Sequence, residues 1–204
     1  MPTSDHHDIP HGTIRKILRS ETHLIKEHLL RLDREARHYR FAHDVSDQFV
    51  AEYAEHAADY GNLNFGYFVD GEIHAIAELR RSPFSFDYTG EAAFSVERDM
   101  SNHGIATKLM GYVIRAARNR GIRHLIMVCL ADNTKMKAIA RHYGADLRFE
   151  DGAIIADIVP KQPDYFSLAA EMFDDRMAYL HAAIDFQTRL SHMIEEPREE
   201  KRAA

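Results

Sequence analysis

The sequence has little cysteine, no long apolar run and no block of basic residues. Its single cysteine, Cys129, cannot form an internal disulfide and lies in the apolar run HLIMVCLA, where we expect a buried thiol. No apolar run approaches the roughly 18 residues of a membrane-spanning helix, and the first residues carry no apolar core of a secretion signal. We therefore expect a soluble, cytoplasmic protein.

The charge balance argues against nucleic acid as a partner. Lysine and arginine number 26, aspartate and glutamate number 32, and the formal net charge is −6. A mildly acidic chain is poorly suited to sequence-independent binding of a phosphate backbone. His6, His7 and His11 could bind a metal ion, but nothing near them fixes a coordination geometry, so we expect a solvated tail and no metal site.

Hydrophobic spacing predicts a chain that alternates helices and strands. Asp70-Gly71 and Asp151-Gly152 are typical hairpin turns, and Ser46 or Asp47 can cap a helix. The expected order is α-α-β-β-β-α-β-α-β-β. We expect helices over 22–41, 46–61, 104–120 and 133–144, strands over 63–69, 72–80, 91–96 and 124–131, and a hairpin over 146–159.

The composition divides the chain into four parts. Residues 1–13 are expected to form a flexible tail, 14–159 a single domain, 160–194 a helical extension, and 195–204 a charged, disordered tail. An apolar stripe in the extension would be left exposed on an isolated helix, so we expect it to pack on the domain or on a second subunit. Self-association as a homodimer is the favoured expectation. The stripe consists of Leu168, Met172, Tyr179, Leu180, Ile184, Leu190, Met193 and Ile194.

Gly104 raises the main functional question. The stretch SVERDMSNHGIATKLM joins a predicted strand to a predicted helix whose first turn holds Gly104, Ile105 and Ala106. Small residues at a helix N-terminus let an anion approach unpaired backbone amides. From the residues alone, a tight turn and a phosphate site are both open. The loop matches neither GxxxxGK[ST] nor GxGxxG, which disfavours an ATP or Rossmann site.

The surrounding residues resemble the GNAT acetyltransferase superfamily. In that family an (Arg/Gln)-x-x-Gly-x-(Gly/Ala) loop follows a strand and opens a helix, and 101–106 read SNHGIA. Asn133 and Gly144 match the family's asparagine and the glycine eleven residues later. The resemblance covers about residues 14–159. It implies an α/β (α+β) fold, with a mixed, mostly antiparallel sheet that is splayed between its fourth and fifth strands and flanked by helices.

A narrower likeness is to the catalytic domain of bacterial protein lysine acetyltransferases. There, a glutamate stands five residues before the valine that precedes the loop, as Glu91 does before Val96. A methionine stands three after the asparagine, as Met136 does here. A Leu-x-x-Leu…Arg-Phe stretch is matched by Leu29, Leu32, Arg40 and Phe41.

The resemblance implies an acetyl-CoA site and a general base. Glu91 would take the proton of the acceptor amine, with Glu97, Asp99 and Asp87 as alternatives, and backbone amides near Val96 would polarise the thioester carbonyl. Cys129 is not expected to act as a nucleophile. The residues expected at the coenzyme are Phe94, Ser95, Val96, Ser101, Asn102, His103, Gly104, Ile105, Ala106, Thr107, Asn133 and Met136.

Two positions depart from the family pattern. Ser101 stands where the loop usually has arginine or glutamine, so a side-chain contact to phosphate is lost or weakened. Ala140 stands where many members have a tyrosine that protonates the coenzyme thiolate, which agrees with the protein-lysine subgroup. Tyr143, three residues further on, is either a replacement acid or a packing residue.

The implied function is acetyl transfer from acetyl-CoA to a primary amine by direct attack. A protein lysine is one acceptor class. A small-molecule amine or polyamine is an alternative, since an acidic protein suits a cationic acceptor. A non-catalytic regulator that binds acyl-CoA is the third reading, because the loop residue is altered and the tyrosine is missing.

Overall fold

The computed structural model describes residues 11–59, 61–81 and 88–200, with side chains described up to residue 191. Within these residues a seven-stranded sheet has the order β1-β2-β3-β4-β5-β7-β6. Only the β4–β5 pair is parallel, so the sheet is mixed and mostly antiparallel, as expected. The strands are β1 (Thr13–Lys16), β2 (Leu63–Val69), β3 (Glu72–Arg81), β4 (Thr89–Val96), β5 (His124–Leu130), β6 (Asp146–Glu150) and β7 (Ala153–Ile158).

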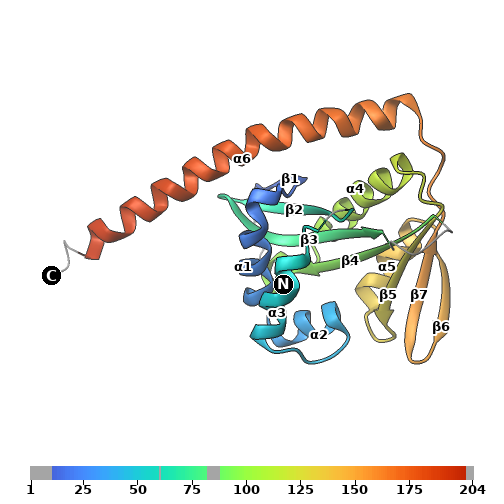
Figure 1. Ribbon diagram of the computed structural model, residues 1–204. Helices are drawn as coiled ribbons and strands as arrows, with labels where there is room; N and C mark the ends of the chain where they lie inside the picture. The colour runs from blue at the N-terminus through green and yellow to red at the C-terminus, as the bar shows by residue number, and fades with distance from the viewer. Residues whose placement is uncertain (1–10, 60, 82–87, 201–204) are drawn as a thin grey trace, which may run out of the picture.

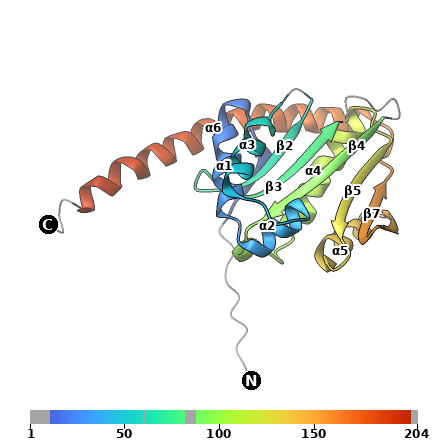
Figure 2. The ribbon, with the colours of Figure 1, turned by 60° about the horizontal axis from the view of Figure 1, so that its bottom comes forward.

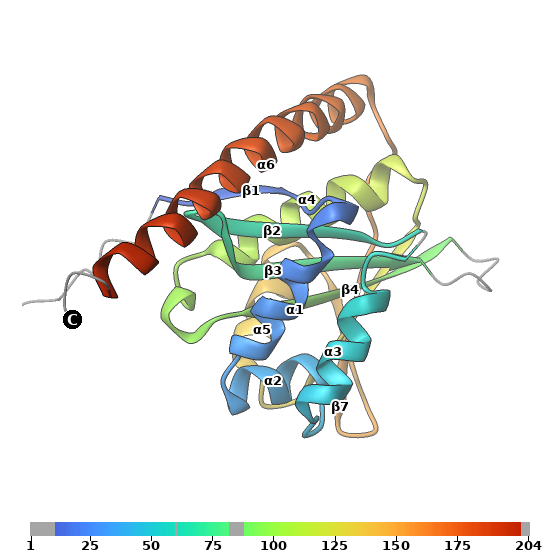
Figure 3. The same ribbon diagram turned by 60° about the vertical axis from the view of Figure 1, so that its left-hand side comes forward.

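Helices cover both faces of the sheet (Figures 1 and 3). One face packs on α1 and α3 through Leu29, Val50 and Ile76, and the other packs on α4 through Leu109, Val113 and Ala77. The helices are α1 (Thr22–Arg31), α2 (Arg34–Phe41), α3 (Asp47–His56), α4 (Ile105–Asn119), α5 (Thr134–His142) and α6 (Tyr165–Glu200), with two 3₁₀ turns, η1 (Arg19–Glu21) and η2 (Arg98–Met100).

Local signals in the sequence placed most of these elements. Ser46 caps α3 by accepting from the amide of Phe49, and Asp70-Gly71 and Asp151-Gly152 form hairpin turns in which all four residues have positive φ. Gly121, with φ of 68°, follows the end of α4 as expected.

Two expected helices need correction, and one strand has no counterpart among the expected elements. The helix expected over 22–41 is two helices, because Leu32 has extended backbone angles and Asp33 caps α2 by accepting from the amide of Ala36. The helix expected over 46–61 ends at His56. The sequence does not predict strand β1, because its four residues, Thr13–Lys16, are too few to show a hydrophobic periodicity.

The two tails also differ in part from expectation. The amide of Gly12 donates to Tyr67 Oη at 3.0 Å and Thr13 begins β1, so the end of the 1–13 segment is held by the sheet. Helix α6 continues to Glu200, into the segment expected to be disordered. Residues 1–10 and 201–204 lie outside the described residues, as do His6 and His7.

Helix α6 crosses the edge of the sheet beside β1 and α4, and its C-terminal part runs on beyond the domain (Figures 1 and 2). Its contacts with the domain are mainly ionic. Arg15 pairs with Asp185 at 2.7 Å, and Arg120 pairs with Glu171 at 2.6 Å. Among the described helices, none is long and apolar enough to cross a membrane.

Candidate functional site

Strands β4 and β5 separate after a short stretch of parallel pairing. Their ladder consists of three residue pairs, of which Glu91 with Ile126 is the last. Beyond that pair the two strands diverge, and their facing backbone groups are available to a ligand instead of to each other. This break in the sheet is the structural basis of the site.

A pocket of about 750 Å³ occupies the break, and we call it the splay pocket. The ends of β4 and β5 form its walls, and the loop 100–107, helix α2 and helix α5 complete it. Since two strands, two helices and a loop converge on it, the pocket is held by elements that are fixed by the core on both faces of the sheet.

The loop at the mouth of the splay pocket exposes backbone amides. Gly104 is the N-cap residue of α4 and has φ of 74°, and no side chain caps the helix. A Cβ added at Gly104 would meet no atom within 4 Å, so the space in front of the helix is open. The N-terminus of this 15-residue helix therefore presents free donors and a partial positive charge to the pocket, which suits an anion.

Lys135 adds a full positive charge beside this loop. It lies in the first turn of α5, lines the splay pocket and donates from Nζ to Ser101 Oγ at 2.8 Å. The sequence alone does not single out this residue, because only the fold brings α5 to the loop. Ser101 lacks the charge of an arginine, and Lys135 supplies a cation at the same place.

The structure brings most of the expected site residues together. Eleven of the twelve expected coenzyme residues line the splay pocket, and they are Phe94, Ser95, Val96, Ser101, Asn102, Gly104, Ile105, Ala106, Thr107, Asn133 and Met136. His103 is not among the lining residues, and its Nδ1 is buried with no hydrogen-bond partner within the described part of the chain. The side chain of Asn133 caps α5 by accepting from the amide of Met136 at 3.0 Å.

Glu91 lies at the point where the sheet opens. It is exposed, stands opposite Arg80 on β3, and belongs to the last pair that β4 makes with β5. It does not line the splay pocket itself. Since alternate residues of a strand share a face, Glu91 and Ser95 both point to the side of the sheet that carries α1 to α3.

The alternatives to Glu91 have different surroundings. Glu97 receives hydrogen bonds from His28, His74 and Arg31. Burial raises the pKa of this carboxyl, but the two histidines and the arginine outweigh burial and lower it to about 2. Such a carboxylate is a weak base. Asp99 lies in the η2 turn, and Asp87 lies outside the described residues.

A buried ion pair fixes the helix that covers the splay pocket. Arg40 of α2 pairs with Glu78 of β3, which also accepts from Tyr53 Oη at 2.7 Å. Burial raises the pKa of Glu78, but the charges of Arg40 and Arg80 outweigh burial and keep it below its usual range. Because removing one partner of a buried pair leaves an uncompensated charge, this contact holds α2 in place over β4.

Two further expectations concern Tyr143 and Cys129. Tyr143 Oη donates to the carbonyl of Thr107 at 2.7 Å and does not line the splay pocket, which favours its reading as a packing residue between α5 and α4. Cys129 does line the pocket and is 6% exposed, and burial raises the pKa of its thiol. A protonated thiol is a poor nucleophile.

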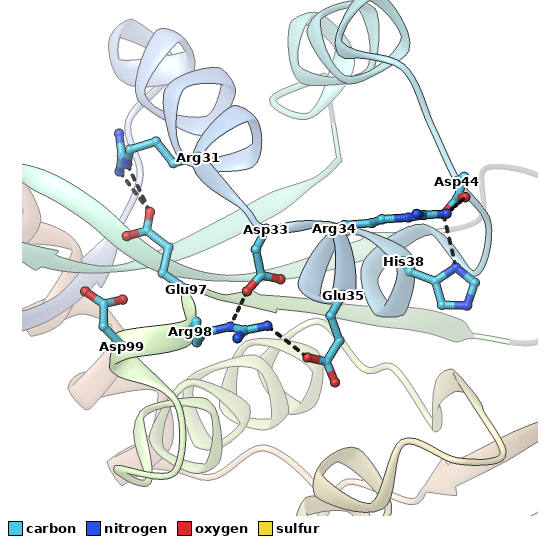
Figure 4. Close-up of a pocket in the computed structure, with 9 residues that line it drawn as sticks. All are labelled: Arg31, Asp33, Arg34, Glu35, His38, Asp44, Glu97, Arg98 and Asp99. Atoms are coloured by element: carbon cyan, nitrogen blue, oxygen red, sulfur yellow. Dashed lines mark hydrogen bonds and ion pairs between the residues drawn. The ribbon is translucent and has the colours of Figure 1, made fainter.

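A second hollow adjoins the splay pocket, and we call it the charged groove (Figure 4). Its volume is about 1350 Å³, and it shares Asp33, Glu35 and Arg98 with the splay pocket. Its residues are Arg31, Asp33, Arg34, Glu35, His38, Asp44, Glu97, Arg98 and Asp99. Four of its five carboxylates pair with arginines of the groove, for example Asp33 with Arg98 at 2.6 Å.

Among the described residues, no cluster of histidine, cysteine and carboxylate side chains could hold a metal ion.

Comparison with known proteins finds one family and several solved structures that are similar to this chain. A model of the Acetyltransferase (GNAT) family matches residues 26–145, which include α2, the loop at Gly104 and α5. The GNAT domain of S. lividans PAT superposes with a TM-score of 0.61 at 22% identity, over 72% of this chain and 90% of that one. The ribosomal-protein-alanine N-acetyltransferase of Brucella melitensis superposes with a TM-score of 0.57 at 17% identity, over 72% of this chain and 99% of that one. The spermidine N-acetyltransferase of Vibrio cholerae, in complex with CoA and spermine, superposes with a TM-score of 0.57 at 16% identity, over 73% of this chain and 95% of that one.

Proposed function

Because the chain belongs to the GNAT acetyltransferase family, whose members use acetyl-CoA as the donor, we propose that it transfers the acetyl group to a primary amine by direct attack. The observation that carries the proposal is the splay pocket with the uncapped N-terminus of α4 at its mouth. A diphosphate matches the bare amides, and an extended thioester arm matches the gap between β4 and β5.

The proposed placement of acetyl-CoA follows from these groups. The pyrophosphate would accept from the amides of residues 102–107, since the amide of Ser101 already donates to the carbonyl of Arg98 at 3.1 Å, and Lys135 would add a cation. The pantetheine arm would lie along Phe94, Ser95 and Val96, where β4 has left β5 and its backbone groups can bind the arm like a further strand. Asn133 and Met136, at the start of α5, would contact the coenzyme from the opposite side of the splay pocket. A backbone amide of β4 near Val96 would polarise the thioester carbonyl.

Glu91 is the proposed general base. An ammonium cannot attack a carbonyl, so the acceptor must first lose a proton. Glu91 is an exposed carboxylate at the closed end of the gap, on the face of β4 opposite to α4, so it can receive a proton directly or through water. The free amine then attacks the thioester carbon without an enzyme-bound acetyl group, since Cys129 is held as a thiol.

A protein lysine is the acceptor that we propose. The charged groove is wide and open, and its carboxylates are largely neutralised by Arg31, Arg34 and Arg98. A polyamine would need carboxylates with uncompensated charge, whereas a polypeptide segment carries groups of both signs and suits a groove of both signs. The motifs shared with protein lysine acetyltransferases, at Glu91 and Met136, point the same way.

An acceptor panel tests this function. We expect release of coenzyme A from acetyl-CoA to depend on added amine, and to be faster with lysine-containing peptides than with spermidine or simple amines at equal concentration. Thiol release measures the rate, and mass spectrometry identifies the acetylated product. Faster turnover of spermidine would support the polyamine reading. Tight binding of acetyl-CoA without turnover of any amine would support a non-catalytic regulator.

We also propose that two copies of the chain associate through α6. This helix turns its charged side to the domain and its apolar side outward. Asp174, Asp175 and Asp185 face basic residues of the domain. Phe173, Leu180 and Ile184 are 64%, 59% and 58% exposed. An amphipathic helix that only covered its own domain would have the opposite orientation.

A second copy fits this surface better than a membrane does. The outward side chains of α6 expose on the order of 1,000 Å² of apolar surface, and a stable protein interface buries about 800 Å² per partner. A two-fold axis would place the same face of α6 on both sides, which is the usual arrangement in homodimers. The net charge of −6 and the acidic inner face of the helix disfavour an anionic lipid surface.

Light scattering tests the dimer. We expect the full chain to have the mass of a dimer and the Leu180→Glu/Ile184→Glu variant to have that of a monomer, because two buried carboxylates would face their symmetry copies across the interface. Phe149→Glu is the matched control, since Phe149 is 67% exposed on the opposite edge strand β6. A monomeric full chain, or loss of the dimer in the control alone, would contradict the proposal.

A further inference from the structure

A histidine of α1 and two residues at the end of β4 form a chain of hydrogen bonds beneath the splay pocket. His28 of α1 lies 2.9 Å from Ser95 Oγ through Nε2 and 3.0 Å from Glu97 Oε1 through Nδ1. Ser95 and Glu97 flank Val96 at the end of β4. A hydroxyl, an imidazole and a carboxylate in this order and at these distances have the arrangement of an acyl-transfer triad.

The three groups connect two different environments. Ser95 lines the splay pocket and Glu97 lines the charged groove, whereas His28 between them is fully buried. Arg31 and His74 also bind Glu97, through Arg31 Nε at 3.1 Å and His74 Nδ1 at 2.8 Å, so this carboxylate is anchored from three sides. Since a buried polar group without a partner is costly, the pairing of both ring nitrogens holds the imidazole in one orientation between Ser95 and Glu97.

Burial and the neighbouring charges determine the protonation states of His28 and Glu97. Burial lowers the pKa of His28, although its hydrogen bond to Glu97 opposes this effect, so the ring is neutral near pH 7. The ionised Glu97 accepts the Nδ1 proton. Nε2 is then left as the acceptor for the Ser95 hydroxyl, which is the tautomer that a proton relay through Ser95 needs.

One proton of the proposed reaction has no assigned carrier. Glu91 removes the first proton of the ammonium, but the amine keeps a further proton that must leave nitrogen after it attacks. The departing thiolate of coenzyme A must gain one. The family's usual donor is absent, because Ala140 stands at its position, and Tyr143 is bound to the backbone of α4.

We propose that Ser95, backed by His28 and Glu97, carries this second proton from the attacking nitrogen to the sulfur of coenzyme A. The inference rests on the proposed acetyl transfer. As the N–C bond forms, Ser95 Oγ accepts the nitrogen's proton and gives its own to His28 Nε2. As the C–S bond breaks, His28 returns a proton through Ser95 to the thiolate. The products are the amide and the free thiol, and all three relay groups regain their initial state.

The relay predicts a non-additive pair of variants. We expect Ser95→Ala and His28→Gln each to lower kcat by about 10²-fold, the lower end of general acid–base effects, with little change in the affinity for acetyl-CoA. The double variant should lose no more than either single variant, because the two groups act as one unit. Each single variant should also show a larger solvent deuterium isotope effect on kcat, since proton transfer then limits the rate.

Two further variants separate the relay from the base and from general damage. Ser95→Ala combined with Glu91→Gln should multiply the two losses, since these residues handle different protons. His124→Gln is the matched control, because His124 forms a histidine–carboxylate pair with Asp157 at 2.9 Å on the other side of the gap, and its kcat should be unchanged. Thermal unfolding of each variant checks that it is folded.

Several outcomes would overturn the relay without touching the acetyl transfer itself. One is that folded Ser95→Ala retains kcat within about threefold of wild type. Another is that only His28→Gln has a lower kcat and that this variant also has a lower melting temperature, which would mean that His28 stabilises the fold and does not carry a proton. A stable acetyl adduct on Ser95 in a quench without amine would make Ser95 a nucleophile. Absence of amine-dependent turnover by the wild-type chain would instead refute the proposed function.

Discussion

Glu91→Gln should lower kcat/KM for the amine acceptor by about 10² to 10⁴-fold, the range of general-base catalysis, and leave the affinity for acetyl-CoA almost unchanged. The substitution keeps the shape of the side chain and removes its basicity. The two effects separate because the proposed phosphate contacts are made by the loop at Gly104, while Glu91 lies at the closed end of the gap between β4 and β5.

The pH dependence gives this prediction a second readout. At high pH more of the acceptor amine is already neutral, so the base is needed less and the loss in Glu91→Gln should shrink. Steady-state kinetics across a pH series would measure this. A loss that stays constant with pH would mean that Glu91 positions the acceptor and does not take its proton.

Glu72→Gln is the matched control for Glu91. Glu72 is also an exposed strand glutamate, but it lies at the start of β3 beside the Asp70-Gly71 turn. Its kinetics should match those of the wild type. A loss below about threefold in Glu91→Gln at neutral pH would contradict the assignment, since general-base effects are larger. A change in coenzyme affinity alone would make Glu91 structural.

The second large effect is expected at the loop that opens α4. Gly104→Glu should weaken the binding of acetyl-CoA by about 10² to 10³-fold, because two like charges about 4 Å apart repel by up to about 4 kcal/mol near a protein surface. A Cβ at Gly104 meets no protein atom within 4 Å, so the new side chain would occupy the space where the pyrophosphate is proposed to lie. Calorimetry measures the affinity directly.

Gly121→Glu is an unusually close control for this variant. Gly121 follows the other end of the same helix, has φ of 68° against 74° for Gly104, and also has no atom within 4 Å of an added Cβ. Both substitutions place a glutamate in a left-handed backbone conformation and should cost similar stability. Unaltered binding in Gly104→Glu, or equal losses in the two variants, would show that the loop does not hold the coenzyme.

Several features were predictable from the sequence because a few adjacent residues determine them. The Asp-Gly turns need only two residues that tolerate positive φ, and Ser46 caps α3 through an amide three positions away. The strand–loop–helix at Gly104 has the same local character, so the loop residues that line the splay pocket can be predicted from the sequence. The alternation of period-two and period-3.6 segments, together with the family motifs, predicted the fold class.

The tertiary structure decided the features that depend on contacts between distant segments. Ser95 and Glu97 meet His28 only because α1 packs on the sheet, and they stand 67 and 69 positions after His28 in the sequence. Lys135 reaches Ser101 only because α5 packs beside the loop. The sequence predicted an apolar stripe in α6, but not that its acidic side would face the domain, since a helical period shows two faces without showing which is covered. Hydrophobic spacing is a local property, whereas the choice of partner is set by charges and shapes that the whole fold brings together.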